Sequence, residues 1–154
     1  MLGTRQLLAD DWAVFRGIRL SALFEAPYAF GSKWEREKEL TEEQWRANVV
    51  ARTRFVVELD GSAVGVAAGG GSDHARSAAL TSLWVDPSAR GKGVGDLLVA
   101  TVVDWARRAG YYQVFLWVAE GNNHAERLYE RHGFVRTGAA VPEPKPEFEM
   151  ALRL

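Results

Sequence analysis

The chain has 154 residues, and its composition, 47% hydrophobic and 25% charged, is typical of one globular domain. Nineteen Lys and Arg nearly balance twenty Asp and Glu, so the formal net charge of −1 does not support a nucleic-acid or membrane-surface partner. The absence of cysteine excludes disulfides, thiolate metal sites and a cysteine nucleophile. No apolar run approaches the roughly 20 residues that cross a bilayer, and no signal-peptide pattern opens the chain. We therefore expect a single soluble, cytoplasmic domain over residues 1–154.

The first third of the chain has the pattern of two helices after a short strand. Residues 4–8 can form the strand, and Asp10 or Asp11 can cap the first helix. A second, charge-rich helix is predicted over residues 33–51. It is expected to break near Thr41, which has the features of a new N-cap.

The rest of the chain alternates strands with two helices. The helices are predicted over residues 93–109, which have the strongest amphipathic pattern, and 122–131. The strands are predicted at residues 54–59, 62–68, 78–85, 111–119, 134–137 and 147–154. Asp60-Gly61 predicts a hairpin between the first two strands, and the nearly continuous apolar run at 111–119 predicts a strand buried on both faces. This order predicts an α/β or α+β sheet with helices on its faces.

The most informative segment joins the strand that ends at Val85 to the helix over 93–109. Three glycines and two cations alternate there, in Arg90-Gly91-Lys92-Gly93-Val94-Gly95. A helix N-terminus presents unpaired N–H groups and partial positive charge, and glycine lets the backbone approach an anion closely. The segment predicts a phosphate site, although a glycine-rich turn with solvated charges would have the same pattern. Gly93 after Lys92, and Asp96 in place of a third glycine, exclude a Walker loop and a dinucleotide fingerprint.

A second motif lies about thirty residues further on, in Asn122-Asn123-His124-Ala125-Glu126-Arg127-Leu128-Tyr129-Glu130-Arg131-His132-Gly133-Phe134. It predicts a short helix that Asn122 or Asn123 caps and Gly133 ends. Asn123 and Glu126 have the spacing of a capping box. Read structurally, Tyr129 is a core residue of this amphipathic helix.

Together, the two motifs resemble the signatures of the GNAT superfamily of N-acetyltransferases. The loop has the pattern R-x-x-G-x-G after a Val-Asp-Pro turn, and the helix has the pattern N-x-x-A-x-x-L-Y-E-x-x-G-F. The N-terminal helical region is also similar, so the resemblance covers essentially the whole chain. It implies a mixed, mostly antiparallel sheet of six or seven strands, splayed in the middle between the strands ending at Val85 and beginning at Tyr111, with about four helices on its faces.

The resemblance implies acetyl-CoA as cosubstrate and no metal. The pantetheine arm would pair with the backbone of Leu83, Trp84 and Val85, as an added strand does. The pyrophosphate would lie against Arg90, Gly91, Lys92, Gly93, Val94 and Gly95. Asn122, Ala125 and Tyr129 would complete the cofactor-binding set. Tyr129 would also be the general acid for the leaving CoA thiolate, because a phenol of pKa near 10 can hydrogen-bond or protonate a thiolate with a conjugate-acid pKa near ~8.5.

The general base stays open at this stage. The strand at 79–85 has no carboxylate, so Glu120 and Glu35 are candidates, Glu58 is a weaker one, and a water chain is the alternative. His74 lies in a polar loop, and the histidines form no metal motif. Without a cysteine, direct attack by the amine is favoured over an acyl-enzyme.

The resemblance implies transfer of an acetyl group to a primary amine of a small molecule or peptide. The alternative is a non-catalytic acyl-CoA-binding sensor or partner module. In this family the acceptor pocket is built by the N-terminal helices, the loop at about 24–34 and the last strands. No nucleic acid or membrane is expected as a partner, a homodimer is compatible with the sequence, and no residue pattern identifies the amine.

Overall fold

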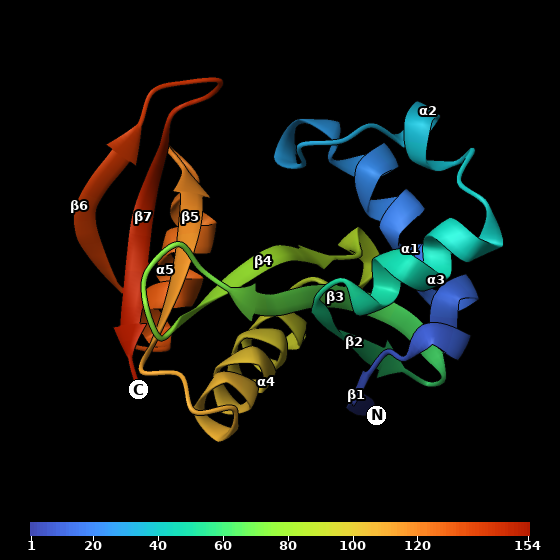
Figure 1. Cartoon of the computed structure of the whole chain (residues 1–154), viewed down its shortest axis with the longest axis horizontal. Helices are drawn as coiled ribbons and strands as arrows, with labels where there is room; N and C mark the ends of the chain where they lie inside the picture. The colour runs from blue at the N-terminus through green and yellow to red at the C-terminus, as the bar shows by residue number, and fades with distance from the viewer. The chain divides into compact units, whose positions relative to one another are not determined.

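A mixed seven-stranded sheet with five α-helices forms the computed structural model, which describes all 154 residues (Figure 1). The strands are β1 (Leu2–Gln6), β2 (Thr53–Leu59), β3 (Ser62–Gly71), β4 (Ser77–Val85), β5 (Gln113–Ala119), β6 (Val135–Val141) and β7 (Glu147–Arg153). Their order in the sheet is β1-β2-β3-β4-β5-β7-β6. β4 and β5 are parallel, whereas the β1–β2, β5–β7 and β6–β7 pairs are antiparallel. The predicted fold class is confirmed, with one helix more than expected.

The helices are α1 (Trp12–Glu25), α2 (Trp34–Glu37), α3 (Glu42–Val50), α4 (Val94–Arg108) and α5 (Asn123–Arg131). The charge-rich segment forms two helices, as the predicted break at Thr41 requires. Thr41 Oγ1 accepts a hydrogen bond from the Gln44 amide at 3.2 Å, and Gln44 Oε1 accepts one from the Thr41 amide at 2.9 Å. This reciprocal capping box fixes the start of α3. None of the helices combines the length and the apolar character of a membrane span.

Contacts between Cα atoms divide the chain into two compact units. The N-terminal unit comprises Met1–Ala68 and Ser82–Leu98, and the C-terminal unit comprises Gly69–Thr81 and Val99–Leu154. A single domain over residues 1–154 stays a prediction.

In the N-terminal unit, α1 and α3 pack through aromatic rings. The rings of Phe15 and Trp45 meet edge-on at 5.7 Å, and both are fully buried. Glu37 is also buried, and Arg19 donates to both of its carboxylate oxygens, at 3.0 and 3.1 Å. Burial opposes ionisation of Glu37, but hydrogen bonds from Arg19 and Ser32 hold its pKa below the ordinary value. A buried charge is tolerated here because it is fully hydrogen-bonded.

In the C-terminal unit, α5 and the β3–β4 loop contact opposite faces of the β5–β7–β6 strands. Arg136 of β6 lies 3.8 Å from the centre of the Phe148 ring and pairs with Glu126 of α5 at 2.7 Å. These contacts place α5 on the face that carries Phe148, and Figure 1 shows the loop passing in front of the strands while α5 lies behind. Trp117 of β5 is 44% exposed. The prediction of a strand buried on both faces is therefore wrong at this residue, because α5 covers only the other face.

β3 approaches α4 so closely that glycine is needed at two positions. A Cβ atom at Gly65 would lie 2.6 Å from Val94 Cγ1, within the N-terminal unit. A Cβ atom at Gly69 would lie 2.5 Å from Trp105 Cζ3, within the C-terminal unit. Real Cβ atoms do not come this near, so these glycines mark close packing of helix on strand.

We expect Gly69→Ala to destabilise the protein by about 1–3 kcal/mol, because the methyl group would displace the partly buried Trp105 ring that packs on β3. The matched control is Gly71→Ala, two residues on in β3, where an added Cβ meets no atom within 4 Å. Urea unfolding of both variants measures the difference. Equal stability of the two would contradict the close-packing interpretation.

Candidate cofactor and acyl-transfer site

A hydrogen-bonded turn connects β4 to α4 in the N-terminal unit. Asp86 Oδ1 accepts from the Ser88 amide at 2.9 Å and from the Ser88 hydroxyl at 2.6 Å. These bonds hold the pKa of Asp86 below its ordinary value. Gly91 and Gly93 follow with φ of 78° and 82°, in the left-handed region that favours glycine. The turn is thus fixed at its start by Asp86 and reversed by two glycines before α4 begins.

The backbone of this turn is open on its outer side. A Cβ at Gly91 or Gly93 would meet no atom within 4 Å, so a ligand could reach these peptide groups directly. α4 begins at once and runs for 15 residues, so its unpaired N–H groups and dipole favour an anion at this end. The predicted phosphate site therefore has the backbone shape that an anion needs.

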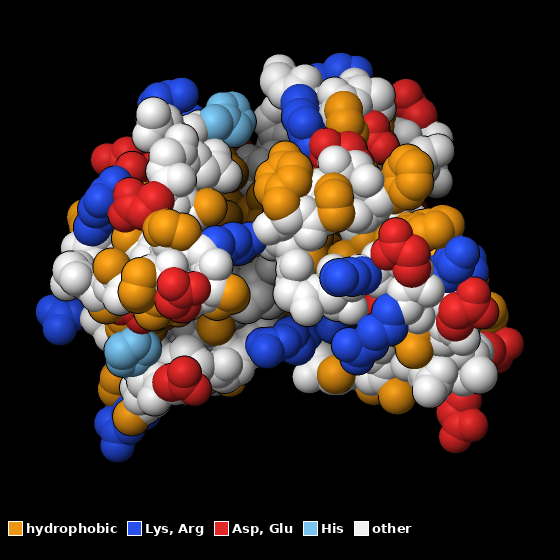
Figure 2. Space-filling model, turned by 90° about the horizontal axis from the view of Figure 1, so that it is seen from above, with side chains coloured by type: hydrophobic (Ala, Val, Ile, Leu, Met, Phe, Trp, Pro, Cys, Tyr) orange, Lys and Arg blue, Asp and Glu red, His pale blue; other side chains and the backbone are white.

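Two of the charges that could meet an anion lie in this turn. Figure 2 shows basic, acidic and hydrophobic side chains on one face of the molecule, with several of the basic ones close together near its centre. Arg90 and Lys92 are both exposed beside the glycines. An anion would therefore meet a small cationic site on a nearly neutral protein, in agreement with the formal net charge of −1.

Glu25, at the end of α1, is a residue that sequence reasoning missed. Its Oε1 accepts from Nη2 of Arg90 at 2.6 Å and from the indole N–H of Trp84 at 2.9 Å. The Trp84 hydrogen bond, with that from Arg90, holds the pKa of Glu25 below its ordinary value against a smaller effect of burial. Nε of Arg90 also donates to the Val85 carbonyl at 3.0 Å. Arg90, which is predicted to meet the pyrophosphate, is thus oriented by Glu25, which lies 65 residues earlier in the chain.

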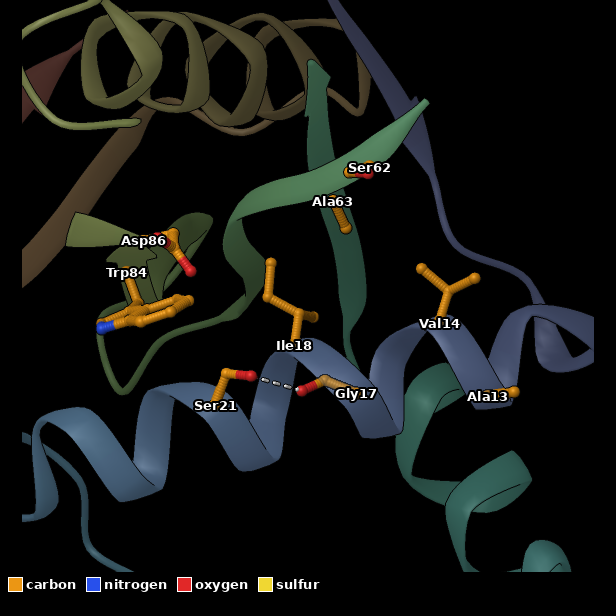
Figure 3. A pocket seen from close by; sticks show the side chains of 9 residues that line it. All are labelled: Ala13, Val14, Gly17, Ile18, Ser21, Ser62, Ala63, Trp84 and Asp86. Atoms are coloured by element: carbon orange, nitrogen blue, oxygen red, sulfur yellow. Dashed lines mark hydrogen bonds between the residues drawn. The ribbon is translucent and has the colours of Figure 1, made fainter. Parts of the chain in front are cut away.

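A cavity of about 300 Å³ lies beside this turn, within the N-terminal unit. Figure 3 shows its wall on α1, where Ser21 Oγ donates to the Gly17 carbonyl at 3.0 Å, opposite Trp84 and Asp86. The remaining lining residues are Ala13, Val14, Ile18, Ser62 and Ala63. Small side chains on α1 therefore leave space against the end of β4.

The three β4 residues predicted to meet the pantetheine arm also belong to this unit. Trp84 is buried, and Leu83 and Val85 are partly exposed. Ser82, immediately before them, has φ of 57°, a left-handed conformation that a non-glycine residue rarely adopts in a strand. Such backbone outliers concentrate at functional sites. No sequence signal distinguished Ser82 from its neighbours.

The C-terminal unit contains the other predicted residues. Asn122 caps α5, and its Oδ1 accepts from the Ala125 amide at 3.1 Å. The capping box predicted between Asn123 and Glu126 does not form, because the Glu126 carboxylate pairs with Arg136. Tyr129 is 8% exposed, and burial raises the pKa of its phenol to about 12.

The candidate bases lie in different surroundings. Glu35 and Glu120 are exposed, in α2 and after β5 respectively. Glu58 is paired with Arg5 at 3.1 Å. None of these three carboxylates therefore has the partly buried position, open to a reactant, that is expected of a general base. His74 is exposed in the β3–β4 loop, and its ring also pairs with the buried carboxylate of Glu149, 75 residues away, a contact that no local pattern predicted.

Comparison with known proteins identifies the family. A model described as the acetyltransferase (GNAT) family matches residues 16–134. The chain belongs to this family. The match includes the whole glycine turn and reaches from α1 to the end of the second motif. The family is one of acyltransferases, so the resemblance inferred from the two motifs is confirmed.

Individual GNAT relatives are similar over parts of their length. An uncharacterized N-acetyltransferase of Methanocaldococcus jannaschii is 33% identical over 52% of this chain and 38% of its own. Streptothricin acetyltransferase of Streptomyces lavendulae is 34% identical over 57% of this chain and 47% of its own. The chain therefore spans less than half of either relative.

A solved structure of a putative acetyltransferase from Salmonella typhimurium, with its cofactor acetyl-CoA, has the same fold. Its TM-score is 0.79, at 21% identity, over 99% of this chain and 94% of that one. At this identity the similarity establishes the fold alone.

We expect Gly93→Glu to abolish acetyl-CoA binding, because the new carboxylate would meet the pyrophosphate on the open side of the turn. The matched control is Gly61→Glu, which puts the same side chain on an equally left-handed glycine with open space, at the β2–β3 hairpin. Both variants bear similar backbone strain, on the order of 1–2 kcal/mol. Calorimetry that finds wild-type affinity in folded Gly93→Glu would rule out the loop as the cofactor site.

Proposed function

We propose that the protein transfers the acetyl group of acetyl-CoA directly to a primary amine of a small molecule or peptide. The glycine turn between β4 and α4 carries this proposal. Its two left-handed glycines, open backbone and helix N-terminus match what a pyrophosphate requires. Because the chain belongs to the GNAT family, acetyl-CoA is the acyl donor in this proposal.

In the proposed complex, the amides of residues 91–95 hold the pyrophosphate. Arg90 and Lys92 add positive charge, with Arg90 oriented by Glu25 and the Val85 carbonyl. The pantetheine arm pairs with the backbone of Leu83 to Val85, a mode that demands no particular side chains. Ser82, whose backbone is in the left-handed region, immediately precedes these three residues in β4.

Tyr129 is proposed to donate a hydrogen bond to the leaving thiolate. Its pKa of about 12 is above that of a CoA thiol, near ~8.5. The phenol therefore keeps its proton at every pH used for assays, which makes it a hydrogen-bond donor to developing negative charge on sulfur. Because the thiol is the stronger acid, hydrogen bonding to the thiolate is favoured over complete proton transfer. Asn122 orients the first turn of the same helix.

The transfer is proposed to be a single displacement. The amine nitrogen bonds to the thioester carbonyl carbon as the C–S bond breaks, and the bonding pair leaves with sulfur. The chain has no cysteine to form an acyl-enzyme. The amine acceptor is to be identified by incubating the protein with acetyl-CoA and a panel of polyamines, amino acids, aminoglycosides and peptides, with free CoA thiol as the readout.

We expect Tyr129→Phe to lower kcat by about 10²-fold, a typical contribution of one acid–base or charge-stabilising group. Affinity for acetyl-CoA should change little, because the hydroxyl acts on charge that develops during transfer. Tyr112→Phe is the control, since Tyr112 is 60% exposed. Steady-state kinetics on the best amine of the panel test this, and an unchanged kcat would remove Tyr129 from the mechanism.

The same panel separates the enzyme from a non-catalytic sensor. An enzyme releases CoA in proportion to amine, and the Tyr129→Phe variant slows that release. A sensor binds acetyl-CoA in calorimetry yet turns over no amine. Thiol release without any amine would indicate hydrolysis and contradict direct transfer.

A further inference from the structure

The cavity between α1 and the end of β4, within the N-terminal unit, is lined by hydrogen-bond acceptors. Ser21 Oγ gives its hydrogen to the Gly17 carbonyl at 3.0 Å, so its lone pairs are left to accept. Both hydrogen bonds from Ser88 to Asp86 end on Oδ1, which leaves Oδ2 for another donor. Figure 3 shows the Asp86 and Trp84 side chains across from α1. A ligand in this cavity would therefore meet oxygen atoms that can accept its hydrogens.

The donors of the lining residues are mostly used elsewhere. The indole N–H of Trp84 donates to Glu25 at 2.9 Å, so the ring offers only its apolar surface. The Asp86 amide donates to the Val64 carbonyl at 2.8 Å. The remaining polar side chain is that of Ser62, whose hydroxyl can both donate and accept. The lining thus favours a ligand that donates hydrogen bonds over an anion.

The charge that the cavity offers is negative. Hydrogen bonds from Ser88 hold the pKa of Asp86 below its ordinary value, so this carboxylate is ionised at neutral pH. Both arginines of α1 donate toward α2 instead. Arg16 donates to the Lys38 carbonyl at 3.4 Å, and Arg19 donates to the buried carboxylate of α2 at 3.0 Å. A cation that enters the cavity would therefore meet a carboxylate whose charge α1 does not offset.

The size of the cavity limits the ligand to a short chain. Its volume of about 300 Å³ is at the lower limit of small-molecule sites. Val14, Ile18 and Ala63 contribute apolar surface to the lining. The Trp84 ring can contact an alkyl chain or an ammonium group. At Gly17 an added Cβ atom would meet no atom within 4 Å, so this glycine helps to keep the cavity open.

Two residues that line the cavity also hold the cofactor turn. Trp84 donates to Glu25, which binds Arg90 at 2.6 Å. Asp86 fixes the start of the turn through Ser88. Besides the Ser88 hydrogen bonds, the charge of Arg90 also lowers the pKa of Asp86, so these two groups attract each other. A cation bound to Asp86 would take over part of this attraction and leave more of the Arg90 charge for a pyrophosphate.

We infer that this cavity binds a small primary ammonium compound, and that its occupation strengthens cofactor binding at the glycine turn. The ammonium group donates to Asp86 Oδ2 and Ser21 Oγ, and its alkyl chain lies against Trp84 and Ile18. The site itself is independent of the proposed function, whereas its link to the cofactor rests on that function.

The bound amine is an effector and not the acceptor. In the proposed complex the pyrophosphate lies on residues 91–95, and the pantetheine arm runs back along β4 from Val85 to Leu83. The thioester is then at the Ser82 end of this stretch, and Asp86, which holds the ammonium group, is at the other end. An amine in the cavity is therefore on the pyrophosphate side of the cofactor.

A titration with n-butylammonium, followed by heteronuclear NMR, tests the site. We expect a Kd of about 1 mM or below, a value within reach of so small a ligand. The indole N–H signal of Trp84 should shift during the titration. The uncharged analogue n-butanol should bind about tenfold more weakly or worse, because it lacks the charge-assisted hydrogen bond to Asp86.

Two variants test where the ligand binds. Gly17→Leu fills the cavity and should abolish binding while keeping α1, because leucine is a better helix former than glycine. Asp86→Asn keeps an acceptor for Ser88 and removes the charge, so it should weaken binding about tenfold or more. The matched controls are Ala47→Leu, at an exposed position of α3, and Asp60→Asn, at the exposed β2–β3 hairpin. Both controls should bind n-butylammonium as the wild type does.

Calorimetry with CoA tests the link to the turn. CoA has the same pyrophosphate as acetyl-CoA and has no acetyl group to transfer to the amine. We expect saturating n-butylammonium to raise the affinity for CoA about fivefold in the wild type and not in Gly17→Leu. Because linkage is reciprocal, saturating CoA should raise the affinity for n-butylammonium by the same factor.

The outcomes separate the site, its link to the turn and the proposed function. The site is overturned if the wild type does not bind n-butylammonium, if n-butanol binds equally well, or if folded Gly17→Leu still binds the amine. Unchanged CoA affinity with n-butylammonium bound overturns the link alone. A protein that binds n-butylammonium but no CoA contradicts the proposed function, and the link with it, while the site is confirmed. If Gly17→Leu acetylates no amine that the wild type acetylates, the cavity holds the acceptor and the effector role is wrong.

Discussion

The close contact between β3 and α4 determines where the proposed cofactor turn can lie. The space beside Gly65, where a side chain would otherwise lie, is filled by Val94 and Leu98. The first turn of α4 therefore packs directly against the backbone of β3. Because Val94 follows Gly93, this contact also fixes the backbone that is proposed to hold the pyrophosphate. A side chain at position 65 would move the helix N-terminus, and with it the direction of the unpaired N–H groups. Core packing and the proposed anion binding thus both depend on the absence of a Cβ atom at Gly65.

A nearly neutral protein can still bind a highly charged cofactor if its cations are oriented locally. Arg90 is held by the Glu25 carboxylate and the Val85 carbonyl, so its guanidinium is ordered before any ligand arrives. The carboxylate offsets part of its charge, and the backbone amides and helix dipole supply attraction that no formal charge count includes. The net charge of −1 therefore says little about this turn.

The parts of the fold predicted from sequence are those that local chemistry decides. Thr41 ends one helix and starts another through bonds to a residue three positions away, and Asp60-Gly61 turns a hairpin through its own left-handed backbone. The glycine turn belongs to this group. The predictions that failed depended on distant partners: Glu126 was expected to cap its own helix and pairs with β6 instead. Trp117 was expected in a buried strand and is exposed, because the pattern does not reveal which face a helix covers.

The sequence by itself determined the family and the fold class, and it predicted the glycine turn and Tyr129 as parts of the site, since each depends on residue types at short, fixed spacings. Only the tertiary structure decided that burial raises the pKa of Tyr129 to about 12, that Glu25 orients Arg90, and that Glu149 is bound to His74. The partners in the Glu25–Arg90 and His74–Glu149 contacts are 65 and 75 residues apart. Burial and pairing over such separations arise when strands and helices pack, and no periodicity along the chain encodes which side chains will then meet.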